Sequence, residues 1–113
     1  MKVKSLVLRG KNHTFERAER RIPVEIPVVL DGHRSAAGSE STFTENVSAR
    51  GARVFSARRW EQGEKLSFAS RTGEFRSSAR VAYCQPVQGE GFAIGVEFLE
   101  IQGRWVVQSS KTA

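Results

Sequence analysis

Apolar residues in this chain recur at every second position, separated by polar or small residues, over most of its 113-residue length. A period of two is typical of half-buried β-strands, because successive side chains of a strand point to opposite faces. Turn-forming residues interrupt the pattern about every ten residues, and no long amphipathic helix is visible. The sequence therefore predicts six short strands, within residues 22–30, 42–48, 52–56, 66–68, 75–83 and 92–98.

Six strands of this spacing imply an all-β antiparallel sandwich or barrel, and a barrel removes the exposed edges of so small a sheet. We predict the six-stranded barrel. Pro23 and Pro27 share one face of the first predicted strand, which predicts an edge strand or one unpaired on one side. Both tryptophans, Trp60 and Trp105, are expected to pack in the barrel, although Trp60 follows two arginines and could instead be an exposed docking residue.

The strict alternation also assigns residues to faces of the predicted strands. It places Asn46 on the same face as Thr44, and Tyr83 on the same face as Val81.

Positive charge is concentrated at the start of the chain. Residues 1–21 hold seven Lys and Arg against two Glu, a net charge of +5, while residues 22–113 hold eleven against ten. We predict a flexible basic arm at residues 1–15, one barrel domain at residues 16–107 and a disordered tail at residues 108–113. Such an arm suits an anionic ligand, although nucleic acid, an acidic membrane surface or a purely solubilising role would fit the same asymmetry.

Several functional classes find no support in the sequence. The single Cys84 has no partner for an internal disulfide or a structural zinc site, which favours a reducing, cytoplasmic setting. No apolar run reaches the roughly 18 residues that span a bilayer. His13 and His33 have no visible partner for catalysis, and Glu61 and Glu64 flank a turn in which carboxylates are solvated. We predict a protein that is not an enzyme and has no metal site and no cofactor.

Five residues in two short motifs point to a binding function. Arg17 and Arg21 lie one helical turn apart, and their planar guanidinium groups can hold phosphate or guanine with two hydrogen bonds. Asn46 and Ser48 add short donors and acceptors, followed by Gly51, which lets a backbone approach closely. Each motif borders a predicted strand. Together they are suited to a phosphorylated purine.

The motifs RxxxR and NxSxxG, in this order, resemble the signature of the PilZ family, whose members bind the bacterial second messenger cyclic di-GMP. Residues 79–84 and 91–98 are similar to the closing strand pair of that family. The resemblance implies a barrel of Greek-key type. Many members end in a helix over the barrel, whereas residues 100–107 are short and interrupted by Gly103, so little or no C-terminal helix is expected.

The resemblance also implies roles for individual residues. Arg17 and Arg21 would hold the phosphates and guanine face of cyclic di-GMP, and the second motif would read the guanine edge. Gly51 is expected either to need a positive φ or to leave space for the ligand, so Gly51→Val should impair binding more than folding. Arg20 and Arg50 are additional candidates, with a solvated surface role as the alternative.

The implied function is a stand-alone cyclic di-GMP receptor that relays the signal to an unknown downstream protein through ordering of its arm. One alternative is an adaptor of the same fold that does not bind nucleotide. A small nucleic-acid-binding barrel, supported by an isoelectric point near 10.2 and interspersed phenylalanines, is less favoured. The basic charge lies in the arm and not along the strand faces, which makes nucleic acid an unlikely partner.

Overall fold

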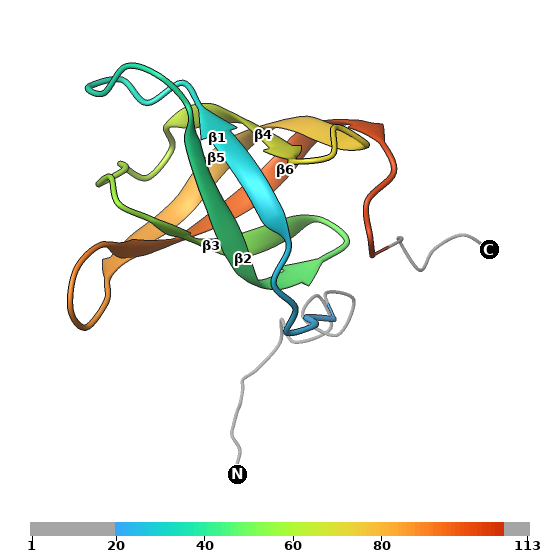
Figure 1. Ribbon diagram of the computed structural model, residues 1–113, viewed down its shortest axis with the longest axis horizontal. Helices are drawn as coiled ribbons and strands as arrows, with labels where there is room; N and C mark the ends of the chain where they lie inside the picture. Colours follow the sequence, from blue (N-terminus) through green and yellow to red (C-terminus); the bar gives the residue numbers. More distant parts are fainter. Residues whose placement is uncertain (1–19, 108–113) are drawn as a thin grey trace, which may run out of the picture.

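The computed structural model describes residues 20–107 and consists of six strands that close into a barrel (Figure 1). The predicted arm at residues 1–15, the tail at residues 108–113 and Arg17 lie outside the described residues. The strands are β1 (Pro27–Asp31), β2 (Glu40–Ser48), β3 (Gly51–Ser56), β4 (Lys65–Ser70), β5 (Phe75–Pro86) and β6 (Phe92–Gly103).

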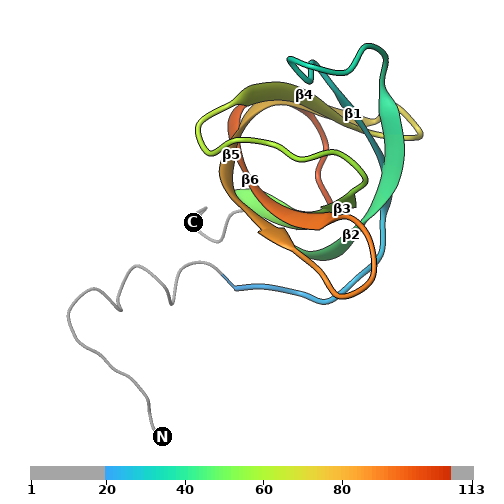
Figure 2. The same ribbon diagram turned by 90° about the vertical axis from the view of Figure 1, so that its left-hand side faces the viewer.

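The strand order around the barrel is β1-β2-β3-β6-β5-β4, and every neighbouring pair is antiparallel. Three consecutive strands are thus followed by a fourth that returns to lie beside the first, which is a Greek key. The long β3–β4 connection makes this return by crossing one end of the barrel (Figure 2). The predicted all-β, six-stranded antiparallel barrel of Greek-key type is confirmed.

Large aromatic side chains fill the barrel. Trp60, in the β3–β4 connection, is 2% exposed, and its Nε1 donates a hydrogen bond to the hydroxyl of Ser56. Trp105, which follows β6, is 5% exposed and packs against three phenylalanine rings. The prediction that both tryptophans pack in the barrel is confirmed. The three rings around Trp105 are those of Phe68, Phe75 and Phe98.

The first strand begins later than the alternation predicts, at Pro27 and not at Ile22. The buried Thr44 gives the reason: its hydroxyl donates to the carbonyl of Val24 at 2.7 Å and accepts from the amide of Ile26 at 2.9 Å. Between the isolated bridge at Ile22 and the strand that begins at Pro27, the Thr44 side chain thus takes the place of regular backbone pairing at the Val24 carbonyl and the Ile26 amide. The predicted unpaired side is also wrong, since β1 pairs with both β2 and β4. Proline is tolerated as the first residue of a strand.

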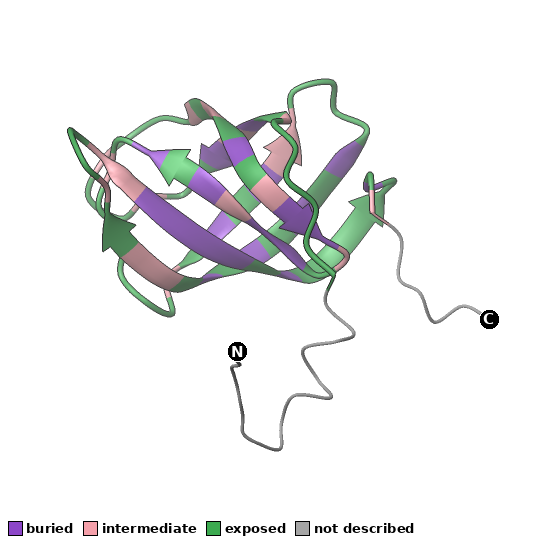
Figure 3. Ribbon diagram, turned by 90° about the horizontal axis from the view of Figure 1, so that it is seen from below, coloured by how far each residue is buried: buried purple, intermediate pink, exposed green. Residues whose placement is uncertain are grey.

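Two shifts of register change the predicted faces. In β2 the pairing with β3 shifts between Thr44 and Asn46, which turns Asn46 away from the inward face of Thr44. In β5 the pairing with β6 shifts between Val81 and Tyr83, so that Tyr83 leaves the inner face occupied by the buried Val81. Both predicted face assignments are therefore wrong. Before the shift between Val81 and Tyr83, buried and exposed residues alternate along β5, and Figure 3 shows buried and exposed segments on the other strands as well.

The C-terminal part of the barrel is extended. β6 continues to Gly103, and residues 20–107 contain no helix, in agreement with the predicted absence of a long C-terminal helix over the barrel. Consequently, none of the described residues forms a helix of the length and apolar character needed to cross a membrane.

Candidate functional site

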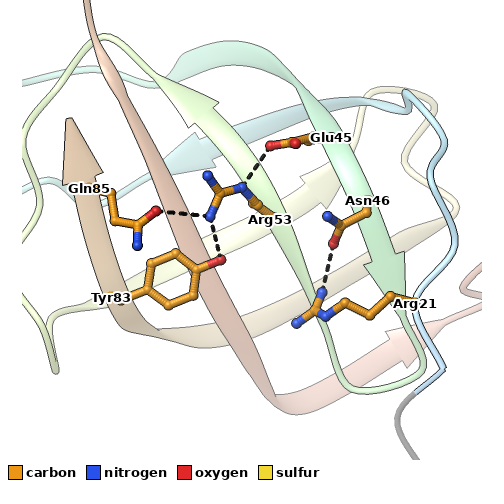
Figure 4. A network of polar contacts seen from close by, with 6 residues as sticks. All are labelled: Arg21, Glu45, Asn46, Arg53, Tyr83 and Gln85. Atoms are coloured by element: carbon orange, nitrogen blue, oxygen red, sulfur yellow. Dashed lines mark hydrogen bonds and ion pairs between the residues drawn. The ribbon is translucent and has the colours of Figure 1, made fainter. Parts of the chain in front are cut away.

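The two sequence motifs meet on the outer wall of the barrel. Just before β1, Ile22 pairs with Val47 of β2 through two backbone hydrogen bonds of 2.8 and 2.9 Å. This pairing fixes the preceding residue, Arg21, beside Asn46. Nη1 of Arg21 donates to Oδ1 of Asn46 at 2.7 Å, although the residues are 25 positions apart in the chain (Figure 4).

The β2 bulge puts Asn46 in this position. Because Thr44 pairs with Val54 while Asn46 pairs with Arg53, Glu45 is an extra residue opposite β3. In a regular strand without a bulge, Asn46 would share the inward face of Thr44. In the bulged strand, Asn46 and Arg53 are cross-strand neighbours on the outer face, where a ligand can reach them.

A polar network that the sequence analysis did not assign to the site lies next to Asn46. Arg53 donates to Glu45 at 2.7 Å, to the Tyr83 hydroxyl at 2.9 Å and to the Gln85 amide oxygen at 3.1 Å (Figure 4). Its guanidinium carbon also lies 5.6 Å from the centre of the Tyr83 ring. The hydrogen bond to Tyr83, followed by that to Glu45, raises the pKa of Arg53 above its ordinary value. Arg53 is therefore a permanent cation beside Arg21 and Asn46.

Buried contacts of the second motif hold the turn between β2 and β3 in place. Ser48 is fully buried, and its hydroxyl accepts a hydrogen bond from the Arg50 amide at 3.3 Å. The indole Nε1 of Trp105 donates to the Ser48 carbonyl at 2.8 Å. The Arg50 carbonyl in turn accepts from the amide of Phe98. These contacts join the turn to the aromatic core, so Ser48 and Trp105 position the site.

Gly51 is required by the barrel itself. Its φ is not positive, and a Cβ at this position would lie 2.2 Å from the carbonyl oxygen of Val96 in β6. Real Cβ atoms do not approach a backbone atom so closely, and a backbone cannot move aside as a side chain can. The expectation of a positive φ or of space reserved for a ligand is therefore wrong, because β6 occupies the space beside Gly51.

The remaining predicted residues are placed as follows. Arg20 and Arg50 are exposed, at the start of the described chain and in the β2–β3 turn. Arg17, the first arginine of the RxxxR motif, lies outside the described residues. His33 contacts the Arg59 carbonyl at 2.8 Å and packs edge-on against Trp60. Among residues 20–107, no group of three His, Cys, Asp or Glu side chains could hold a metal ion.

A family model described as the PilZ domain matches residues 15–105, which includes both motifs and all six strands. The chain belongs to the PilZ family. Among solved structures, the Bacillus subtilis inhibitor of motility MotI/DgrA is similar, with a TM-score of 0.61 and 22% sequence identity. The match covers 74% of this chain and 42% of that structure, so this chain corresponds to less than half of it. No curated protein matches the chain.

Proposed function

We propose that this PilZ-family protein is a receptor for cyclic di-GMP and acts by binding, without catalysis. The contact between Arg21 and Asn46 carries the proposal, because it brings the two signature motifs together on one outer face. The family's signature residues and their order support the same ligand. In this proposal Arg17, Arg21 and Asn46 contact cyclic di-GMP, while Ser48 and Gly51 shape the turn.

The charges on this face are suited to a ligand with two phosphates and two guanines. Arg20, Arg21 and Arg50 are exposed, and Arg53 lies on the same outer face as Asn46. The observed partner of Arg21 is a neutral amide oxygen. A phosphate can replace that partner at a gain, because it adds the attraction between opposite charges to the hydrogen bond that the ionised arginine already donates.

Titration calorimetry with cyclic di-GMP tests the proposal, with cyclic di-AMP, GTP and single-stranded DNA as controls. We expect binding of cyclic di-GMP and at least about tenfold weaker binding of cyclic di-AMP, since adenine presents a donor where guanine O6 accepts. Higher salt should weaken binding, but less steeply than it weakens binding to a long polyanion. Equal affinity for both dinucleotides, or tighter binding of DNA, would favour the nucleic-acid function.

We further propose that cyclic di-GMP orders the chain around Arg17 against the β2–β3 turn, and that a downstream protein recognises the ordered arm. The position of Arg21 supports this proposal. Arg21 follows Arg17 by four residues and is already held beside Asn46. Hydrogen exchange should therefore slow across residues 15–21 when the ligand saturates the protein. Unchanged exchange in this segment, with exchange slowed only in β2 and β3, would show that the arm is not the relay.

A further inference from the structure

The second half of β6 has an open edge, although the barrel as a whole is closed. β3 pairs with β6 only over Phe92–Glu97, and one further backbone bond joins the Phe98 amide to Arg50. Beyond it, residues 100–103 pair with β5 on one side, and Leu99 is the extra residue of a bulge opposite Ser78 and Ala79. Within residues 20–107 no strand pairs with their other side. Their backbone groups on that side are therefore available for a further strand.

This edge lacks two of the residue types that keep natural edge strands from pairing. Its sequence, Leu-Glu-Ile-Gln-Gly, contains no lysine and no proline, the residues that commonly protect an edge. Leu99 is 45% exposed and Ile101 is 50% exposed. A groove of about 1090 Å³ borders the edge and is lined by Ile101, Gly103 and Trp105, among others. The edge thus combines apolar side chains, unpaired backbone and adjoining space.

We propose that the open edge of β6 pairs antiparallel with the same edge of a second copy of this chain. Two identical antiparallel strands are necessarily related by a twofold axis, so each residue pair occurs twice. With Ile101 at the axis, Ile101 faces the partner's Ile101, within the regular part of the edge at residues 100–103. Glu100 then faces Gln102, an acceptor opposite a possible donor, and no like charges meet.

The neighbouring registers are less favourable. An axis at Glu100 would set two carboxylates directly opposite each other, which destabilises a strand pair. An axis at Gln102 would require Arg104 to continue the strand. The chain leaves the strand at Gly103, where φ is 91°, and the amide of Arg104 bonds the carbonyl of Glu74. The register centred on Ile101 is therefore the one that the residues favour.

A second copy suits this edge better than the parts of the chain outside the described residues. Residues 108–113 contain no large apolar side chain that could cover Leu99 and Ile101. The longest apolar run in residues 1–19 is Leu6–Leu8, which is shorter than the edge and is flanked by Lys4 and Arg9, charged residues of the kind that disfavour strand pairing. The inference does not rest on the proposed ligand, whose described contacts are expected at Arg21 and Asn46, although the β2–β3 turn adjoins the start of the open edge.

Site-specific cross-linking of the full chain tests both the dimer and its register. In a Cys84→Ser background, Ile101→Cys should form an intermolecular disulfide readily, because opposed residues in an antiparallel pair lie about 5 Å apart and within disulfide reach. Leu99→Cys is the matched control, since its copies would lie four residues apart, about 13 Å along the strand. Phe43→Cys controls for random collision at an exposed site on β2.

Sedimentation velocity over a range from about 10 µM to 1 mM should show a concentration-dependent dimer, as expected for a small interface. Ile101→Lys should abolish the dimer, whereas Phe43→Lys should preserve it, with thermal melts showing that both variants fold. A wild-type chain that stays monomeric throughout would overturn the proposal. So would Ile101→Cys cross-linking no faster than Leu99→Cys or Phe43→Cys, which is also the result expected if residues 1–19 cover the edge.

Discussion

Replacing both Arg17 and Arg21 by alanine is expected to weaken cyclic di-GMP binding by about 100-fold or more. Each arginine would lose a charge-assisted hydrogen bond worth about 1.5–3 kcal/mol, or about 10- to 100-fold in affinity. The two losses need not add, since both side chains would contact one ligand. Titration calorimetry of the single and double variants measures the effect directly.

Stability should hardly change in these variants, because Arg21 is exposed and its described contact is a single hydrogen bond to Asn46. A change within about 0.5 kcal/mol in the free energy of unfolding is expected. Arg59→Ala provides the matched control. It removes one exposed positive charge from the β3–β4 connection, which lies at the end of β3 opposite the β2–β3 turn. Wild-type affinity in the double variant, or an equal loss in Arg59→Ala, would contradict the site.

The fold and the meeting of the two motifs follow from local features of the sequence. Alternating residues place the apolar side chains of each strand on one face. Closing six such strands into a barrel removes the exposed edges of a small sheet. The pairing of Ile22 with Val47 continues the apolar pattern of residues 22–30 even though regular strand begins only at Pro27. Arg21 directly precedes this pattern, so its position beside β2 could have been predicted from the sequence.

The register shifts were not predictable in this way. An extra residue at Glu45 leaves no mark in the sequence, because Glu is compatible with either arrangement of an exposed strand. Yet this residue decides that Asn46 points outward beside Arg53. The shift before Tyr83 has the same effect on β5, where it brings the phenol within 2.9 Å of Arg53. Arg53 itself could have been noted as an outward-facing arginine two residues after Gly51.

Contacts between distant parts of the chain explain what else the sequence leaves open. Trp105 is recognisable as a packing residue, but its hydrogen bond to the Ser48 carbonyl joins positions 57 residues apart. Likewise, a glycine in a motif suggests a positive φ or a bound ligand. Only the β3–β6 pairing shows that the restricted space beside Gly51 belongs to the carbonyl of Val96.

Gly51→Ala is therefore expected to destabilise the barrel by about 3 kcal/mol or more, since a new Cβ would press on backbone in a closed sheet. For a domain of this size that loss lowers the melting temperature by about 12 °C or more. Gly95→Ala is the matched control in the paired strand. There the added Cβ meets the ring of Tyr83, at 2.2 Å from Cε2, and the ring can swing outward. Thermal unfolding should show a clearly smaller loss for Gly95→Ala. If Gly51→Ala melted like the wild-type protein but no longer bound cyclic di-GMP, the glycine would serve the ligand and not the barrel.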